Sequence, residues 1–137
     1  MDYTHSMAIS AAGMSLERTR VEVAALNIAN ANTIAGPNGE VFRPLRVVAD
    51  ADFASAVDAG LGVANVRLEQ AAATPRMVYE PGHPMADGRG FVAYAGVDMA
   101  AEMVSLMSAT RSYEANIAAM NTSRNLALKA LEIGGNQ

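Results

Sequence analysis

The chain of 137 residues contains no cysteine and no tryptophan, and its only lysine is Lys129. Without cysteine it can form no disulfide, thiol nucleophile or thiolate metal site. A net charge of −4 leaves no basic surface for a nucleic-acid backbone, so we expect no nucleic-acid partner. No apolar run is long enough to span a bilayer. The first cation, Arg18, comes too late for the charged start of a secretory signal.

Small and flexible side chains take the place of large aromatic ones. Alanine occupies 28 positions and methionine nine, whereas aromatic residues make up 5% of the chain. Such side chains suit close, repeated contacts between helices. The composition therefore favours helix packing over a ligand pocket, and we expect no cofactor, no metal and no small-molecule substrate.

Glycine and proline divide the chain into three segments, 1–35, 36–96 and 97–137. The middle segment holds all five prolines and eight of the eleven glycines. Because these residues interrupt helices, the terminal segments are predicted to be long helices and the middle to form short strands. The predicted fold class is mainly α, with two long terminal helices paired as an antiparallel coiled coil and a small β-rich middle segment.

The C-terminal helix is predicted from about 98 to 132, with Asp98 as its N-cap and Gly134-Gly135 as its end. Apolar side chains recur along it at alternating steps of four and three residues, which is typical of a coiled-coil seam. The predicted seam contains Met99, Met103, Leu106, Thr110, Tyr113, Ile117, Met120, Arg124, Ala127 and Leu131.

The N-terminal helix, predicted over about 7–32, carries two apolar rows. The seam row is Met7, Ala11, Met14, Arg18, Val21, Ala25 and Ile28. A second row, Ile9, Leu16 and Val23, lies well around the helix axis. Two long helices cannot cover both rows, so this pattern predicts contacts with other chains.

Short strands are predicted in the middle segment at 41–48, 64–69, 77–80 and 91–94. The first is interrupted by Pro44, which favours an edge position. A segment of this size cannot bury much surface alone. We therefore expect a small knob or hairpins lying on the helices.

Two polar features of the helices allow alternative interpretations. The motif ALNIANANT (25–33) places Asn27, Asn30 and Asn32 near a helix end. They either end the helix, with Asn30 or Asn32 in a left-handed conformation, or bridge neighbouring helices and fix their register. Arg111 and Glu114 stand three apart and can pair along one helix, or can act between chains.

Other residue groups could suggest chemistry, but each has a simpler interpretation. The titratable cluster Tyr79, Glu80, His83 and Asp87 lies in a proline-rich turn and is predicted to be solvated. The acidic group Asp50, Asp52 and Asp58 lacks the pattern of a calcium loop. The methionines Met99, Met103 and Met107 could bind copper, yet their helical spacing favours core packing. No catalytic, cofactor-binding or metal-binding residue is predicted.

Long motifs at both ends of the chain resemble those of one known family. These are ALNIANANT and the C-terminal stretch VDMAAEMVSLMSATRSYEANIAAMNTSRNLALKALEI (97–133). Together they resemble the paired terminal signatures of the bacterial flagellar axial proteins of the rod and hook. The middle motifs GPNGEVFRPLRVV (36–48) and VYEPGHPMADGRGFV (78–92) are similar to those of the short, proximal-rod members. The resemblance covers about residues 7 to 133.

The resemblance implies a structural protein without enzymatic activity. It implies a helical tube formed with itself and other flagellar rod proteins, which crosses the periplasm and transmits torque from the membrane ring to the hook. It also implies type III export without a cleaved signal, and contacts with membrane-ring and export-apparatus proteins at the proximal end. The residues we predict at the assembly interface are Met7, Met14, Val21, Asn27, Ile28, Asn30, Met99, Met103, Leu106, Tyr113, Ile117, Met120 and Leu131.

Two other hypotheses share the helices. A non-flagellar coiled-coil adaptor or export chaperone has no need of both terminal signatures. A distal rod or hook subunit carries a larger inserted domain, for which the middle segment leaves no room.

Overall fold

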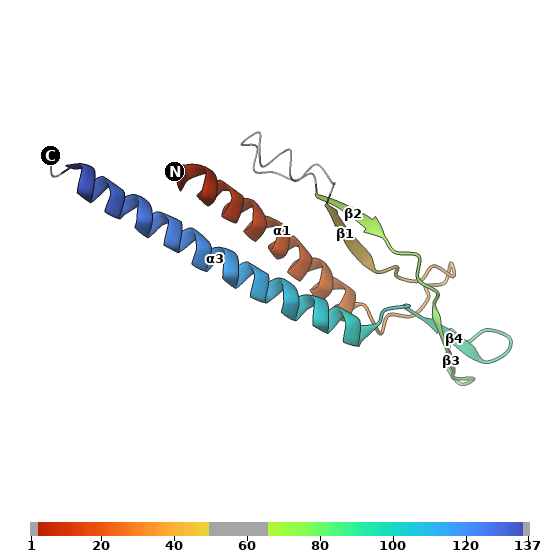
Figure 1. Cartoon of the computed structure of the whole chain (residues 1–137). Helices are drawn as coiled ribbons and strands as arrows, with labels where there is room; N and C mark the ends of the chain where they lie inside the picture. The colour runs from red at the N-terminus through yellow and green to blue at the C-terminus, as the bar shows by residue number, and fades with distance from the viewer. Residues whose placement is uncertain (1–2, 50–65, 136–137) are drawn as a thin grey trace.

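The molecule is a pair of long helices with two small antiparallel sheets between them in the chain (Figure 1). The computed structural model describes residues 3–49 and 66–135. Its elements are α1 (Tyr3–Ala29), β1 (Leu45–Ala49), β2 (Val66–Gln70), β3 (Arg76–Tyr79), β4 (Phe91–Tyr94) and α3 (Met99–Gly135). The helices α1 and α3 pack side by side and antiparallel. The predicted mainly α fold with a small β-rich middle is confirmed.

The helix α3 begins where the sequence predicts. The Oδ1 atom of Asp98 accepts hydrogen bonds from the backbone N–H groups of Ala100 and Ala101, both at 3.1 Å, and so caps the first turn. The predicted end is wrong, because the helix continues through Gly134 and Gly135. Glycine permits a left-handed stop but does not require one. At 1.5 Å per residue, α3 is about 55 Å long.

The helix α1 ends through local hydrogen bonds. Asn30 Nδ2 donates to the Leu26 carbonyl at 2.9 Å, and Thr33 Oγ1 donates to the Asn30 carbonyl at 2.8 Å. No non-glycine residue in the described ranges has a positive φ, so the left-handed conformation expected at Asn30 or Asn32 is wrong. The Leu26 carbonyl accepts both the backbone N–H and the side-chain amide of Asn30, so the last turn is closed without a left-handed residue.

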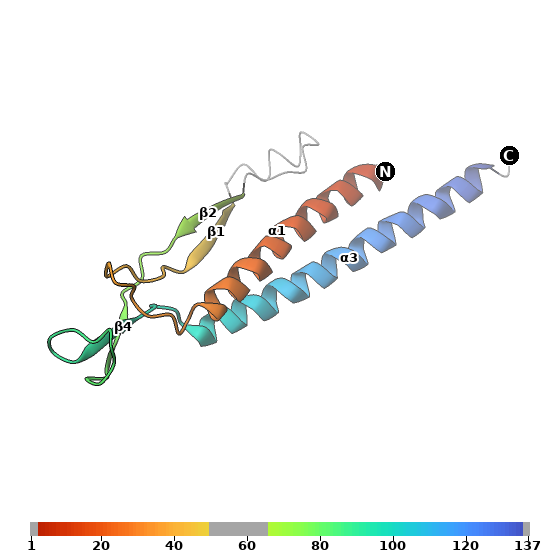
Figure 2. The same ribbon diagram turned by 180° about the vertical axis from the view of Figure 1, so that it is seen from behind.

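The β1–β2 sheet lies along α1, on the side away from α3 (Figures 1 and 2). The strand β1 begins directly after Pro44, later than predicted, because proline has no N–H to donate to a ladder. Val23 is buried at 8% exposure and faces the same cleft as Leu45 and Val47 of β1. Part of the second apolar row of α1 is therefore covered within the chain, which corrects the expectation that only other chains could cover it.

The β3–β4 hairpin lies beyond the end of α1 and the start of α3 (Figure 1). The strand β4 also contacts the segment after α1, since the backbone N–H groups of Ala35 and Ala95 donate to the carbonyls of Ala93 and Thr33. A β-carbon on Gly96 would collide with the Thr74 carbonyl oxygen. This close approach requires glycine at the junction between the hairpin and α3.

Candidate assembly interface

The contact between α1 and α3, called here the seam, is built largely from small and polar residues. On α1 the buried members are Ser10, Glu17 and Ala24, spaced seven residues apart. On α3 one row of the seam is Glu102, Ala109, Asn116 and Ser123, of which Ala109 and Ser123 are buried. We call these two sets the inner rows. Their seven-residue period is that of a coiled coil.

A second row on each helix is half-buried beside the inner row. These shared rows are Met7, Met14, Val21 and Ile28 on α1, and Leu106, Tyr113, Met120 and Ala127 on α3. They belong to the predicted seam. The rest of that seam is wrong by one residue on both helices: Ser10 and Glu17 are buried where Ala11 and Arg18 were expected, and Ala109 is buried instead of Thr110.

Close contacts join the inner row of α3 to small residues of α1 that lie beside its own inner row. Ser6 Oγ and Ser123 Oγ share a hydrogen bond at 2.9 Å across the seam. One heptad further along, a β-carbon on Gly13 would lie 2.9 Å from both terminal atoms of the Asn116 side chain. Real β-carbons do not approach polar atoms so closely, so this pairing depends on glycine. The helices thus approach each other most closely at small and polar residues, and the larger apolar side chains of the shared rows lie at the edge of the contact.

Asn27 has a role that neither sequence hypothesis anticipated. It is fully buried, its Nδ2 donates to the Leu45 carbonyl at 2.9 Å, and its Oδ1 accepts the Leu45 N–H at 2.8 Å. One side chain therefore satisfies both backbone groups of the first residue of β1. Asn27 joins α1 to the sheet rather than to another helix. This link also explains the rotated seam, because α1 must turn Val23 and Asn27 toward β1.

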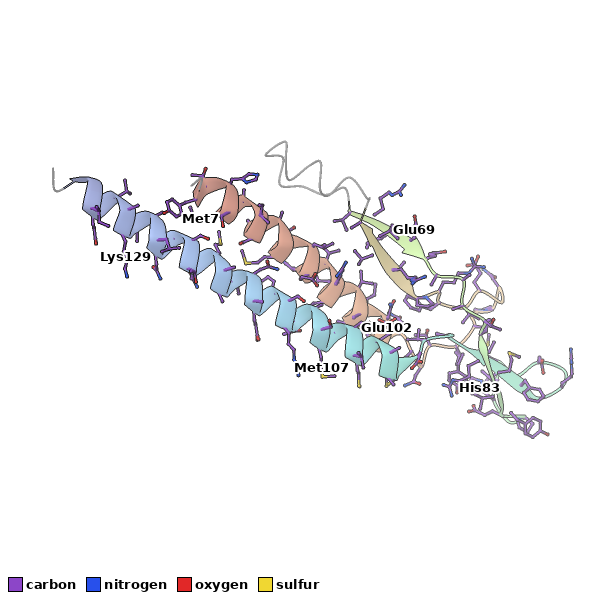
Figure 3. The ribbon with its side chains drawn as sticks, viewed as in Figure 1. Met7, Glu69, His83, Glu102, Met107 and Lys129 are labelled. Carbon is purple, nitrogen blue, oxygen red and sulfur yellow. The ribbon has the colours of Figure 1, made fainter. Side chains whose placement is uncertain are left out.

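The residues predicted at the assembly interface fall into three groups. Asn27 is buried, and the half-buried group is Met7, Met14, Val21, Ile28, Asn30, Leu106, Tyr113 and Met120. The exposed group is Met99, Met103, Ile117 and Leu131, at 36%, 47%, 38% and 72%. The expectation that the methionine row is core of this helix pair is wrong, since Met107 is 55% exposed. Figure 3 shows Met107 and Lys129 projecting from α3 on the side away from α1.

This exposed side of α3, called here the outer face, is defined by Met99, Met103, Met107 and Ile117. Further along the same helix, Leu128, Leu131 and Ile133 are exposed as well. Isolated exposed apolar side chains are common, but several large ones on one side of a helix mark a candidate interaction surface. The outer face is the strongest candidate site in the described part of the chain.

Two ion pairs lie on α1. Arg18 contacts Glu22 at 3.0 Å with both side chains largely exposed, and Arg20 contacts Glu17 at 3.1 Å. The predicted pair between Arg111 and Glu114 does not form within the described chain. Both of these side chains are exposed on α3.

The titratable residues of the β3–β4 turn stabilise the hairpin. His83 Nδ1 accepts the Met85 N–H at 3.1 Å, and Asp87 Oδ1 accepts the N–H groups of Arg89 and Phe91. The bonds from Phe91 and Arg89 lower the pKa of Asp87 below its usual value. Figure 3 shows His83 in this projecting hairpin, away from the helix pair.

Tyr94 and Glu80 form the other polar contact of this hairpin. The Tyr94 hydroxyl donates to the Glu80 carboxylate at 3.2 and 3.3 Å, and the Arg76 guanidinium lies 5.1 Å from the centre of the Tyr94 ring. Burial of the hydroxyl, followed by its bond to Glu80, raises the pKa of Tyr94. Tyr79 packs edge-on against Phe91, with 5.3 Å between ring centres. These contacts fix the hairpin and do not converge on a common point.

The described residues contain neither a metal-binding cluster nor a membrane-spanning helix. Residues 3–49 and 66–135 contain no group of three or more histidine, aspartate or glutamate side chains able to hold a metal ion. The acidic residues Asp50, Asp52 and Asp58 lie outside the described residues. No helix in the same ranges is apolar enough over a sufficient length to cross a membrane.

A cleft of about 460 Å³ lies between α1, α3 and β1. Its charged lining residues are Glu17, Arg20, Arg46 and Glu102, and its apolar ones include Val23, Val47 and Val104. Two residues of each charge give the cleft no net preference for anions or cations. It separates the sheet from α3 on the side opposite the outer face.

The chain is similar to known proteins over almost its whole length. A family model described as "Flagellar basal body rod FlgEFG protein C-terminal" matches residues 89–133. The flagellar basal-body rod protein FlgC of Salmonella typhimurium is 40% identical over 126 residues, covering 92% of this chain and 93% of the relative.

Other relatives have the same name. FlgC of Escherichia coli O6:H1 is 41% identical, with coverage of 92% and 93%, and FlgC of Bacillus subtilis is 34% identical, with coverage of 95% and 97%. The family model includes β4 and almost all of α3. It therefore matches the helix that carries the outer face.

Proposed function

We infer the function of this chain from one premise: it belongs to the FlgC family of flagellar basal-body rod proteins. The chain is a structural subunit of the basal-body rod, and it assembles with other rod components. The observation that carries this function in the structure is the outer face of α3, where large apolar side chains remain exposed because the chain does not cover them itself.

We propose that the chain occupies the proximal rod and transmits torque across the periplasm from the membrane ring to the hook. Two long helices with capped or bonded ends resist bending and twisting far better than loops do. Subunits that repeat one heterologous contact form an open helical array instead of a closed ring. Torque then passes from subunit to subunit through packed side chains.

The assembly interface predicted from the sequence is retained in this proposal where residues are accessible. Met99, Met103, Ile117 and Leu131 are exposed and available to a neighbour. Asn27 is excluded, because its amide is used within the chain. The segments 1–35 and 97–137 supply the helical core of the tube, and 36–96 supplies the part outside that core.

The chain acts by packing and catalyses no reaction in this proposal. Three of the four titratable residues of the β3–β4 turn hold hairpin hydrogen bonds, and Tyr79 packs against Phe91. Export through the flagellar type III apparatus without a cleaved signal, and contacts with membrane-ring and export-apparatus proteins at the proximal end, are parts of the same proposal. They are supported by membership of the family.

A gene deletion tests the proposed function. We expect cells that lack the chain to retain the membrane ring, to build no rod and not to swim, and a plasmid copy to restore all three features. Basal bodies are purified and imaged, and swimming is scored on soft agar. Intact rods and normal swimming in the deletion strain would contradict the proposal.

A further inference from the structure

The outer face of α3 combines apolar side chains with two opposite charges. Met103, Met107 and Ile117 are exposed at 47%, 55% and 38%. Arg111 and Glu114 lie between them along the helix, and neither forms an ion pair with another described residue. The shared row of α3 lies between the outer face and the seam. The apolar side chains of α3 therefore extend beyond the surface that α1 covers.

An exposed side of α1 has the complementary features. Its exposed residues at alternating steps of four and three are Ala11, Ser15, Arg18, Glu22, Ala25 and Ala29. The Arg18 and Glu22 side chains are 74% and 62% exposed. The uncharged members are small, whereas the apolar members on α3 are large. The two surfaces therefore differ in side-chain size, and each carries one charge of each sign.

One antiparallel alignment matches both size and charge. When Arg18 is set opposite Glu114, Glu22 comes next to Arg111. The same alignment places small residues opposite large ones, in the pairs Ser15 with Ile117, Ala25 with Met107, and Ala29 with Met103. Moving the partner by one heptad places Met107 or Asn121 opposite Arg18, and both charge pairs are lost.

These contacts cannot form within one chain. The α1 helix of the same chain already contacts α3 through Ser6 with Ser123 and Gly13 with Asn116, on a different side of each helix. We propose that the outer face of α3 binds the exposed side of α1 from a second copy of this chain, antiparallel, with Arg18 opposite Glu114 and Ala25 opposite Met107. This proposal rests on the proposed function, since it names the partner of the same rod-forming surface.

The contact joins two different surfaces and therefore does not close on itself. A copy that offers α1 to one neighbour keeps its α3 free for another, as an open helical array requires. Unlike charges at the contact specify the register, because a displaced neighbour would leave charges opposite apolar or like-charged groups. The apolar contacts bury the surface that the isolated chain leaves exposed.

Disulfide trapping tests this register, and the absence of native cysteine leaves only introduced thiols to react. Two full-length versions are expressed together, one with Ala25→Cys and one epitope-tagged version with Met107→Cys. After mild oxidation of purified basal bodies, we expect a covalent dimer that contains both versions. The matched control replaces Met107→Cys by Ala100→Cys, one heptad or about 10 Å away. Disulfides do not form between residues so far apart, so the control is expected to give no dimer.

Two outcomes would overturn the proposed contact, and a third would instead contradict the proposed function. Rods that contain the chain but yield no dimer with Ala25→Cys and Met107→Cys overturn the register. Equal amounts of dimer in the pair and in the control overturn it as well. Purified rods that lack the chain contradict the proposed function itself.

Charge exchange provides a second measurement without oxidation. We expect Arg18→Glu and Glu114→Arg each to reduce the swimming-zone diameter at least about twofold, because each places like charges in contact. The two changes in one chain restore unlike charges between positions 18 and 114 and should recover part of the lost swimming, because the pair between Arg18 and Glu22 within α1 is still lost. Helix content of the purified variants, measured by circular dichroism, controls for folding. Two impaired single variants without recovery in the double variant would argue against the contact.

Discussion

The two sides of α3 differ in a way that reverses the usual pattern of a soluble helix. The inner row, which contacts α1, contains Glu102, Ala109, Asn116 and Ser123, whereas the outer face contains Met103, Met107 and Ile117 at 38% to 55% exposure. In an ordinary surface helix the large apolar residues face the core and the polar residues face solvent. Here the larger apolar residues are shared between the seam and the outer face.

This difference separates folding from assembly. Small residues allow two helices to approach closely, and hydrogen bonds such as that between Ser6 and Ser123 satisfy the polar groups of the seam. The hydrophobic surface on the outer face remains available to a neighbouring subunit. We expect a subunit built in this way to fold through its internal contacts and to bury further apolar surface when the rod forms.

Leu106→Asp is expected to have the largest effect, because Leu106 is half-buried in the shared row between the two sides. A carboxylate at this position loses apolar contacts with α1 and faces a poorly hydrated surface. We expect the isolated chain to lose about 3 kcal/mol of unfolding free energy and the cells to build no rod. Urea denaturation measures the first effect and basal-body imaging the second. Leu106→Met is the matched control and should preserve both.

Met107→Asp, at the adjacent residue, should prevent assembly without affecting folding. Met107 is 55% exposed and projects away from α1, so the isolated chain loses no internal contact. We expect its unfolding free energy to change by less than about 0.5 kcal/mol, whereas rods and swimming are lost. Met107→Leu keeps the apolar contact and should swim normally. A Met107→Asp strain with normal rods would mean that no neighbour covers the outer face.

Asn27→Leu tests the link between α1 and the sheet. This link stabilises the fold of the single chain and is not part of the outer face. The variant leaves the N–H and the carbonyl of Leu45 without their partner in a buried setting. We expect a loss of about 3 kcal/mol in the unfolding free energy of the isolated chain, measured by urea denaturation. Asn30→Ala is the control, since Asn30 is only half-buried and bonds a carbonyl of its own helix. Its effect should stay below about 1 kcal/mol.

The elements of the fold were predictable because their signals are local. Asp98 caps α3 as its position before an apolar periodic segment predicts, and the strands lie close to the alternating segments of the middle. The end of α3 was not predictable from Gly134 and Gly135, since glycine allows several conformations. Of the two alternatives for Arg111 and Glu114, the pair along the helix does not form in the described chain, and the role between chains stays a prediction.

The side of each helix that forms the seam was predicted only in part. Apolar spacing identified the shared rows, including Leu106, because these residues are both apolar and regularly spaced. The same spacing placed Met103 in the seam instead of Glu102, because hydrophobicity alone favours methionine over glutamate at a buried position. The rotation of α1 depends on Asn27 and its hydrogen bonds to Leu45, a contact between distant segments that spacing cannot reveal. The seven-residue period of Ser10, Glu17 and Ala24 was the available signal.

The effect of Gly13→Ala on stability should change sign when Asn116 is replaced by alanine, which tests how closely α1 and α3 pack at this point. In the native chain the new β-carbon would lie 2.9 Å from the Asn116 side chain and displace it from its bond to the Ser112 carbonyl. We expect Gly13→Ala to reduce the unfolding free energy by about 1 kcal/mol. In an Asn116→Ala background the same change should increase it by about 0.5 to 1 kcal/mol, because alanine favours helix over glycine. The same sign in both backgrounds would show that the two residues are not in contact.

The smallest predicted effect concerns the β3–β4 hairpin, which lies apart from both sides of α3. Burial and the bond to Glu80 raise the pKa of Tyr94, so the folded chain favours the neutral phenol more than the unfolded chain does. The resulting stabilisation is complete below the usual tyrosine pKa of 10.0 and is lost as the pH rises through the higher folded pKa. Ultraviolet titration of the native chain minus that of Tyr94→Phe isolates this residue among the four tyrosines.

Glu80→Gln removes the carboxylate and should move the pKa of Tyr94 back toward 10.0, without effect on the thermal stability of the helix pair at neutral pH. An unchanged pKa in Glu80→Gln would assign the shift to burial alone, and a loss of helix stability would show that the hairpin and the helices unfold as one unit.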